Sequence, residues 1–211
     1  MFAITPQMMS NFFNSISKFI ILLSIILITV AGVLIIFLEN DYYQGISFKI
    51  MFIHVPAAWL SLMIFFSMGI SSIIGLIFKS PTSFTISRSL SPVGLIMSIM
   101  VLITGSIWGN LTWGTYWVWD ARLTSMLILA FIYLGHLFLL YSFEHFQKAD
   151  FAASILAIIG MVNIPIVKFS VDWWTTLHQG SSVFKVSGPS MTTDYLITLL
   201  VSFFAILLLS L

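Results

Sequence analysis

The feature that most constrains this chain is a set of six long apolar runs that contain no Lys, Arg, Asp or Glu. The runs cover Phe19–Leu38, Pro56–Phe78, Pro92–Trp108, Leu123–Tyr141, Phe151–Val167 and Tyr195–Leu211. A helix of roughly 20 residues crosses a hydrocarbon core of about 30 Å, so each run predicts one membrane span. We therefore expect an all-α integral membrane protein, a bundle of six transmembrane helices with a Trp-rich interfacial loop. The runs leave no room for a soluble domain, so residues 1–211 are expected to form a single polytopic membrane domain.

Composition excludes several kinds of chemistry. Only 7% of the residues are charged, too few to cover a soluble globule, and the net charge of +1 gives no footprint for nucleic acid. The absence of cysteine excludes thiolate nucleophiles, iron–sulfur sites and covalent attachment of haem. No Gly precedes a Lys, so there is no P-loop and any ATP-driven step needs a partner. The first apolar run lacks a small-residue cleavage site after it, which favours a retained helix over a signal peptide.

The six runs place the connecting segments alternately on two sides of the membrane. Segments 39–55, 109–122 and 168–194 share one side, and the N-terminal 18 residues share the other with segments 79–91 and 142–150. Each side carries four Lys or Arg residues, so the positive-inside rule gives no orientation. A G-x-x-x-G spacing at Gly105 and Gly109 predicts close helix packing.

The segment 108–125, here called the Trp-rich loop, concentrates aromatic side chains. It holds Trp108, Trp113, Trp117 and Trp119, followed by Asp120 and Arg122. An ordinary aromatic belt places Trp at both interfaces, whereas all seven tryptophans of this chain lie on or next to one side. On a short interfacial helix Trp113 and Trp117 would share a face and form a flat aromatic shelf. Such a shelf suits a large planar ligand with charged edges, and an unusually one-sided membrane anchor is the alternative.

Two of the four histidines lie on the same side as the tryptophans. His54 precedes Val55-Pro56, and Pro is favoured in the first helical turn, so His54 is expected just before the second span. His178 follows Trp174 by four residues, and in a helical turn the two would share a face. A lone interfacial histidine is usually a hydrogen-bonded bystander, but two beside an aromatic shelf can supply both axial imidazoles of one haem iron.

The other two histidines have plainer expectations. His136 lies inside the fourth span, where it makes either an interhelical hydrogen bond or a functional contact. His145 lies in the opposite loop and is expected to be solvated.

Four short sequences together resemble one family. The run W-G-T-Y-W-V-W-D-A-R-L-T-S at 113–125 is similar to the tryptophan-rich WWD sequence of cytochrome c maturation proteins that handle haem. H-V-P-A-A at 54–58, V-N-I-P-I at 162–166 and W-W-T-T-L-H-Q-G at 173–180 resemble the CcmC family in particular. The resemblance extends from about Asp41 to Gly180. Relatives continue past the sixth span into a charged cytoplasmic tail, whereas this sequence ends at Leu211 within the apolar run.

The resemblance implies a function that composition does not. It implies that His54 and His178 are the axial ligands of a non-covalent haem b. It also implies a location in the bacterial or mitochondrial inner membrane, with the Trp-rich loop facing the periplasm or intermembrane space. The haem would pass to the chaperone CcmE, with CcmD, CcmA and CcmB as further partners. The expected haem-binding residues are Trp108, Trp113, Trp117, Trp119, Asp120, Arg122 and Trp174.

The residue chemistry leaves some roles open. Arg122, Lys185 or Lys49 can pair with the haem propionates. Asp120 can bind Arg122, or it can accept a hydrogen bond from an imidazole N–H.

Two other functions compete with haem delivery. A b-type cytochrome oxidoreductase needs histidine pairs on facing helices within the membrane, and a small-molecule transporter subunit is expected to carry charges inside its spans. The sequence offers neither, and it shows no catalytic constellation, so we expect a binding and delivery protein without turnover chemistry.

Overall fold

The computed structural model describes residues 5–180, 182, 183, 185 and 188–211, and the ordered elements within these ranges are helices. They are α1 (Pro6–Phe37), the 3-10 helix η1 (Ile46–Ile50), α2 (Met51–Phe78), α3 (Pro81–Trp113), α4 (Ala121–Tyr141), α5 (Phe146–Gly160), α6 (Asn163–Trp173) and α7 (Thr193–Leu209). The predicted all-helical membrane fold is confirmed.

Five segments of the described chain are long and apolar enough to cross a membrane. They are Ile16–Phe37, Ile46–Phe78, Pro81–Trp113, Ala121–Tyr141 and Phe146–Trp173, and the last of them combines α5 and α6 around a turn at residues 161–162. The sixth predicted span corresponds to α7, an apolar helix of 17 residues, or about 25 Å. Five of the six predicted spans thus correspond to these segments, and the sixth corresponds to the shorter apolar helix α7.

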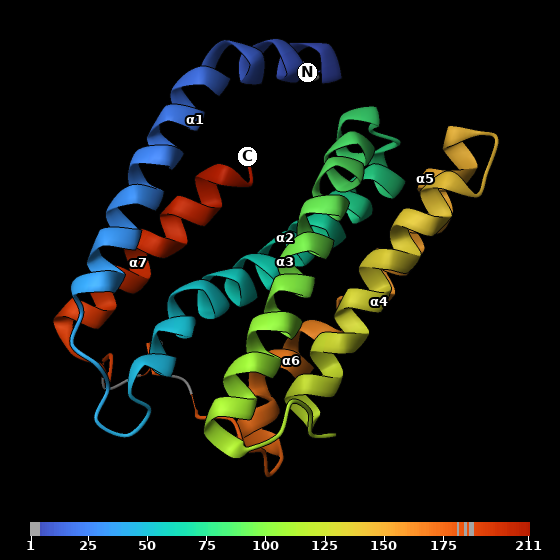
Figure 1. Ribbon diagram of the computed structural model, residues 1–211. Coiled ribbons are helices and arrows are strands. Elements are labelled where there is room, and N and C mark those ends of the chain that lie inside the picture. Colours follow the sequence, from blue (N-terminus) through green and yellow to red (C-terminus); the bar gives the residue numbers. More distant parts are fainter. Residues whose placement is uncertain (1–4, 181, 184, 186–187) are drawn as a thin grey trace.

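The helices alternate in direction, so their ends gather at two levels (Figure 1). One level, which we call the Trp end, holds the ends of α1, α3 and α6 and the starts of α2, α4 and α7. The other level, the opposite end, holds the starts of α3 and α5. This is the alternation that the six apolar runs predict.

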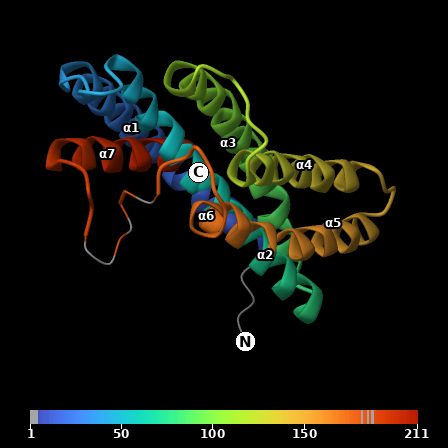
Figure 2. The ribbon, with the colours of Figure 1, turned by 90° about the horizontal axis from the view of Figure 1, so that it is seen from below.

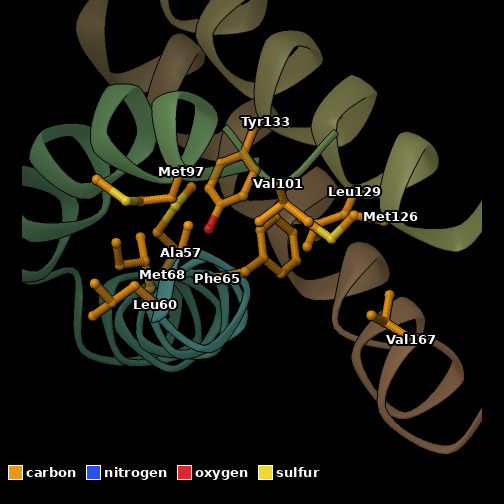
Figure 3. Close-up of a cluster of buried hydrophobic side chains, with 11 residues drawn as sticks. Ala57, Leu60, Phe65, Met68, Met97, Val101, Met126, Leu129, Tyr133 and Val167 are labelled. Atoms are coloured by element: carbon orange, nitrogen blue, oxygen red, sulfur yellow. The ribbon is translucent and has the colours of Figure 1, made fainter. Parts of the chain in front are cut away.

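Helix α2 is the centre of the bundle. It packs against α3, α5 and α7, while α1 packs mainly on α7 (Figure 2). The largest buried cluster joins α2 to α3, α4 and α6 (Figure 3) and contains Ala57, Leu60, Ile64, Phe65, Met68, Met97, Val101, Met126, Leu129, Tyr133 and Val167. Tyr133 reaches across this cluster and donates a hydrogen bond to the Ser61 carbonyl at 2.7 Å. A rigid α2–α3–α4 core thus supports the Trp end.

Polar contacts join the helices nearer the opposite end. His136 of α4 lies 3.0 Å from Ser91 Oγ and 3.4 Å from Ser87 Oγ, both on α3, so its interhelical hydrogen-bonding role is confirmed. Arg88 of α3 forms an ion pair with Asp150 of α5. His145 is exposed and precedes α5, as expected of a solvated residue.

Candidate functional site

His54 lies within α2, so its predicted position before the helix is wrong. The 3-10 helix η1 runs directly into α2 at Met51, and Pro56 is accommodated inside the helix. Proline fixes φ near the helical value and removes one N–H, so a helical turn can still form on its N-terminal side at the loss of one hydrogen bond. His54 consequently faces a neighbouring helix of the bundle.

The His54 imidazole packs against α3. Its Nδ1 lies 3.0 Å from Thr104 Oγ1, and its ring meets Trp108 edge to face with centroids 5.7 Å apart. Trp108 is itself fixed by the hydrogen bond that its Nε1 donates to Gln44 Oε1 at 2.8 Å. His54 is thus held between two helices, next to the first tryptophan of the Trp-rich loop.

Gly114 changes the geometry that we predicted for the aromatic shelf. Helix α3 continues to Trp113 and ends at Gly114, whose φ of 76° lies in the left-handed region that glycine tolerates best. Trp117 therefore lies in the non-helical linker 114–120, and the prediction that Trp113 and Trp117 share a helix face is wrong. Trp117 and Trp119 are also nearly perpendicular, at 78°, so these two rings do not form one flat surface.

The two tryptophans of the linker differ in exposure. Trp119 is 79% exposed and presents an apolar face. Trp117 is partly buried, and among the described residues its buried Nε1 has no hydrogen-bond partner. An unpaired buried donor costs free energy unless a ligand accepts from it. The linker thus offers a large planar ligand both an aromatic face and a hydrogen-bond donor.

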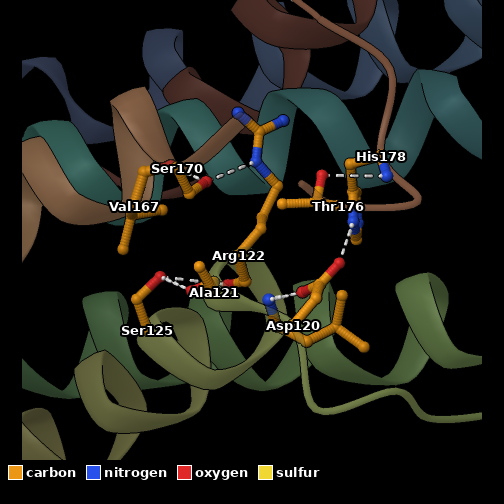
Figure 4. A network of polar contacts seen from close by, with 9 residues as sticks. Asp120, Ala121, Arg122, Ser125, Val167, Ser170, Thr176 and His178 are labelled. Atoms are coloured by element: carbon orange, nitrogen blue, oxygen red, sulfur yellow. Dashed lines mark hydrogen bonds and ion pairs between the residues drawn. The ribbon is translucent and has the colours of Figure 1, made fainter. Parts of the chain in front are cut away.

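Asp120 connects the linker to His178. Oδ1 accepts a hydrogen bond from the Leu123 N–H at 2.8 Å and caps α4, while Oδ2 lies 3.2 Å from His178 Nδ1 (Figure 4). Of the two roles that the sequence allowed for Asp120, the structure shows the contact with imidazole. An ionised carboxylate is only an acceptor, so Nδ1 carries the hydrogen and the neutral His178 keeps a free lone pair on Nε2.

His178 approaches this site from a loop. Helix α6 ends at Trp173, and Trp174 is extended, so the prediction that Trp174 and His178 share a helix face is wrong. Trp174 is half exposed and pairs edge to face with Trp173, whereas His178 packs edge to face on Trp113 with centroids 4.9 Å apart. The aromatic partner of His178 is thus Trp113 of α3 and not Trp174.

Burial lowers the pKa of His178 below its ordinary value of 6.5. The Asp120 carboxylate and its hydrogen bond act in the other direction, and the Arg122 charge adds to the lowering. The imidazole is consequently neutral at physiological pH, which is the form that ligates metals.

Arg122, at the start of α4, places a positive charge near His178. Its Nε donates to Ser170 Oγ at 3.1 Å, so the guanidinium turns toward α6 (Figure 4). The fold therefore brings His54, His178 and Arg122 to the Trp end, where His54 contacts Trp108 and His178 contacts Trp113 and Asp120.

The structure adds three residues that sequence reasoning did not assign to this site: Gln44, Thr104 and Gly105. A Cβ at Gly105 would lie 2.9 Å from His54 Cε1, and one at Gly109 would lie 3.2 Å from Trp113 Cε3. The G-x-x-x-G spacing was the available signal, but it predicted contact between helix backbones. Here Gly105 makes room for the imidazole ring of His54, and Gly109 makes room for the ring of Trp113.

The residues of the Trp end suit a metal that is already coordinated by another molecule, and not a bare metal ion. Among the described residues, no three His, Cys, Asp or Glu side chains gather in a way that could hold a bare metal ion. Two imidazoles beside tryptophan rings fit haem, because the porphyrin supplies four ligands and leaves two axial positions.

Known proteins resemble this chain over most of its length. The family model described as CcmC, heme exporter protein C, matches residues 1–211. The "Heme exporter protein C" of Bradyrhizobium diazoefficiens is 46% identical over 170 residues, which are 81% of this chain and 65% of that protein. A "Putative cytochrome c biosynthesis ccmC-like mitochondrial protein" of Marchantia polymorpha is 48% identical over 164 residues, 78% of this chain and 69% of that protein.

The "Heme exporter protein C" of Escherichia coli K12 is 45% identical over 156 residues, 74% of this chain and 64% of that protein. The match with these relatives thus spans about two thirds of their length. Together with the bacterial and mitochondrial relatives, the five apolar helices support a multi-pass membrane protein. The chain belongs to the CcmC, heme exporter protein C, family.

Proposed function

We propose that this protein binds haem b at the Trp end, with His54 and His178 as the axial ligands of the iron, and delivers it for cytochrome c maturation. One observation carries the proposal: the fold brings two histidines from separate elements to one end of the bundle, each against a tryptophan edge. The family supports the same reading, since its members are named heme exporter proteins. Haem is the cargo here, and its iron supplies the axial positions that the imidazoles fill.

The tryptophans and Arg122 have separate roles in this proposal. The exposed face of Trp119 covers the porphyrin ring, and Trp117 Nε1 donates to a polar group at its edge. Arg122 carries five N–H donors, and its contacts with Ser170 and the Lys168 carbonyl use two of them, so the guanidinium retains donors for a propionate. Lys49 donates to the Ile36 carbonyl and Lys185 to Ser190 Oγ, whereas Arg122 lies two residues after Asp120, the carboxylate that contacts His178, so Arg122 is the propionate partner that we favour.

The proposed recipient is the chaperone CcmE, with CcmD and the CcmA–CcmB pair as partners in the inner membrane. His178 lies in a loop and its side chain is partly exposed, so the haem is reachable from outside the bundle. Delivery then consists of ligand exchange at the iron, and no residue of this chain needs to perform turnover chemistry.

Absorption spectra of the purified protein test the ligand assignment. We expect one low-spin haem b in the parent and loss of the low-spin spectrum in both His54→Ala and His178→Ala. His145→Ala is the matched control, because His145 is exposed near the opposite end and should change nothing. An unchanged six-coordinate spectrum in either ligand variant would remove that histidine from the site.

The same preparation distinguishes the competing functions. Two haems that quinol reduces would indicate a b-type oxidoreductase, and flux of a small molecule without haem would indicate a transporter subunit. Transfer of haem from the parent to purified CcmE, and its loss in the ligand variants, would support delivery.

A further inference from the structure

We propose that Thr104 and Gly105, consecutive residues of α3, position His54 so that Nε2 is the nitrogen it offers to iron. The inference rests on the proposed function only in naming iron as the partner of Nε2. The ring tautomer and the ring position are properties of the protein without haem, so they can be measured separately.

The tautomer follows from the single hydrogen of the Thr104 hydroxyl. Oγ1 lies 2.6 Å from the Met100 carbonyl oxygen, four residues earlier in the helix, and 3.0 Å from His54 Nδ1. A carbonyl oxygen only accepts, so the hydroxyl hydrogen goes to Met100 and the oxygen can only accept from His54. Nδ1 therefore carries the ring hydrogen, and Nε2 keeps its lone pair.

The ring position follows from the missing side chain of Gly105. A Cβ there would lie 2.9 Å from Cε1 of His54, 3.4 Å from Nδ1 and 3.9 Å from Nε2. Contacts below about 3 Å force the ring to move, and an imidazole is a rigid plane already held by the Thr104 hydroxyl. Gly105 thus lets the ring lie directly on the α3 backbone.

Trp108 holds the ring from another direction. Its indole meets the imidazole at 77° and is anchored to Gln44, so it cannot follow a displaced ring without losing that hydrogen bond. A hydroxyl acceptor, a glycine surface and an indole edge thereby fix His54 before any ligand binds.

His178 provides an independent parallel. Its Nδ1 faces the Asp120 carboxylate, so it too offers Nε2. In both histidines the free nitrogen is Nε2, but the acceptor that contacts Nδ1 differs. It is a hydroxyl of α3 for His54 and a carboxylate at the start of α4 for His178. Outer partners of this kind typically change metal affinity by roughly 10–100-fold when they are removed.

Nitrogen NMR of the haem-free protein, with its histidine rings labelled, tests the tautomer. The His54 signal is identified by its absence in His54→Gln. We expect Nδ1 of His54 to be protonated in the parent and in Thr104→Ser, and the hydrogen to move toward Nε2 in Thr104→Val. Thr198→Val is the matched control, since Thr198 is buried in α7 and donates to the carbonyl of Asp194 four residues earlier. A protonated Nε2 in the parent, or a Thr104→Val tautomer like that of the parent, would overturn the assignment of Thr104.

Haem titration of the same proteins tests the consequence. We expect Thr104→Val and Gly105→Ala to bind haem roughly 10–100-fold more weakly, and Thr104→Ser to bind like the parent. Gly32→Ala is the control for added volume, because a Cβ at Gly32 meets nothing within 4 Å. Parent-like affinity in Gly105→Ala would overturn the role of Gly105. A parent that binds no haem would instead refute the proposed function, while the tautomer measurement would still decide the proposal for Thr104.

Discussion

At the scale of single residues, Asp120 performs two tasks with its two carboxylate oxygens. Oδ1 caps α4 through the Leu123 N–H, and Oδ2 accepts from His178 Nδ1. Asn is as good an N-cap as Asp but carries no charge. The substitution Asp120→Asn therefore separates the structural task from the electrostatic one.

We predict that Asp120→Asn keeps the start of α4 and lowers the pKa of His178 further. Asp120 raises that pKa, whereas burial lowers it, so removing the charge leaves burial less opposed. Because the folded-state pKa of His178 lies below the ordinary 6.5, the contribution of this histidine to folding stability is fully present above pH 6.5. It falls as the pH drops and the imidazole must be protonated. Acid should consequently destabilise the haem-free variant more than the parent, as thermal unfolding at pH 5 and pH 7.5 would measure.

Asp172→Asn is the control, because this exposed carboxylate lies at the same end without contacting His178 in the described structure. An NMR titration in which His178 of Asp120→Asn titrates at a higher pH than in the parent would contradict the prediction.

The tryptophans of the linker are expected to act in graded fashion. Stacking of one aromatic ring on a large ligand contributes on the order of 1 kcal/mol, so Trp119→Ala should weaken haem binding about fivefold. Trp119 is 79% exposed, so its loss should leave the fold intact. The triple variant of Trp113, Trp117 and Trp119 should lose most binding, and haem titration with circular dichroism would measure both effects. A triple variant that retained parent affinity would make these residues membrane anchors.

At the scale of helices, the apolar runs predict correctly which segments are helical. They predict less well at which residues the helices begin and end. The third run begins at Pro92, yet α3 begins at Pro81, because Ser80 caps it and proline suits the first turn. Its far end extends past the apolar run to Trp113, where Gly114 adopts a positive φ. Helix ends are decided by caps and by glycine, and these signals lie outside the apolar pattern.

The candidate site could likewise be predicted from the sequence only in part. The order of histidine, tryptophans and histidine was visible in the sequence, and it identified the residues that the fold brings together. The contact of His54 with Gly105 joins two helices, so neither local spacing nor hydropathy contains it. Sequence reasoning therefore found the candidate ligands but not the residues that hold them.

Gly94 tests how tightly α3 must pack on α4. A Cβ at Gly94 would overlap the Tyr133 ring and its hydroxyl, which donates to the Ser61 carbonyl of α2. We predict that Gly94→Ala destabilises the fold by about 1–3 kcal/mol, the usual cost of overpacking a core. Denaturant unfolding in detergent would measure the loss against Gly32→Ala, whose added methyl meets nothing within 4 Å. Equal stability of the two variants would mean that Tyr133 moves aside freely.

At the scale of the whole molecule, the alternation of helices places both candidate ligands at one end. His54 belongs to α2 and His178 follows α6, and four membrane crossings, an even number, separate the start of α2 from the end of α6. The apolar runs alone predict this parity, and the structure confirms it (Figure 1). Parity leaves open which compartment the Trp end faces.

The orientation of the Trp end in the membrane follows from the proposed function. The eight Lys and Arg residues divide equally between the two sides, so the positive-inside rule favours neither topology. Delivery of haem for cytochrome c maturation outside the cytoplasm or matrix requires the Trp end to face that outer compartment. The absence of cysteine makes the test direct, because one introduced thiol is then the only thiol in the protein.

We predict that Tyr43→Cys, at the Trp end, reacts with an impermeant maleimide in intact cells, whereas Gln147→Cys, near the opposite end, reacts only after the membrane is opened. Both positions are exposed, so the surrounding protein does not block the reagent. Both variants should label fully in detergent, which controls for thiol reactivity. Labelling of Gln147→Cys but not of Tyr43→Cys in intact cells would place His54 and His178 on the cytoplasmic side, where they could not hand haem to an outer chaperone.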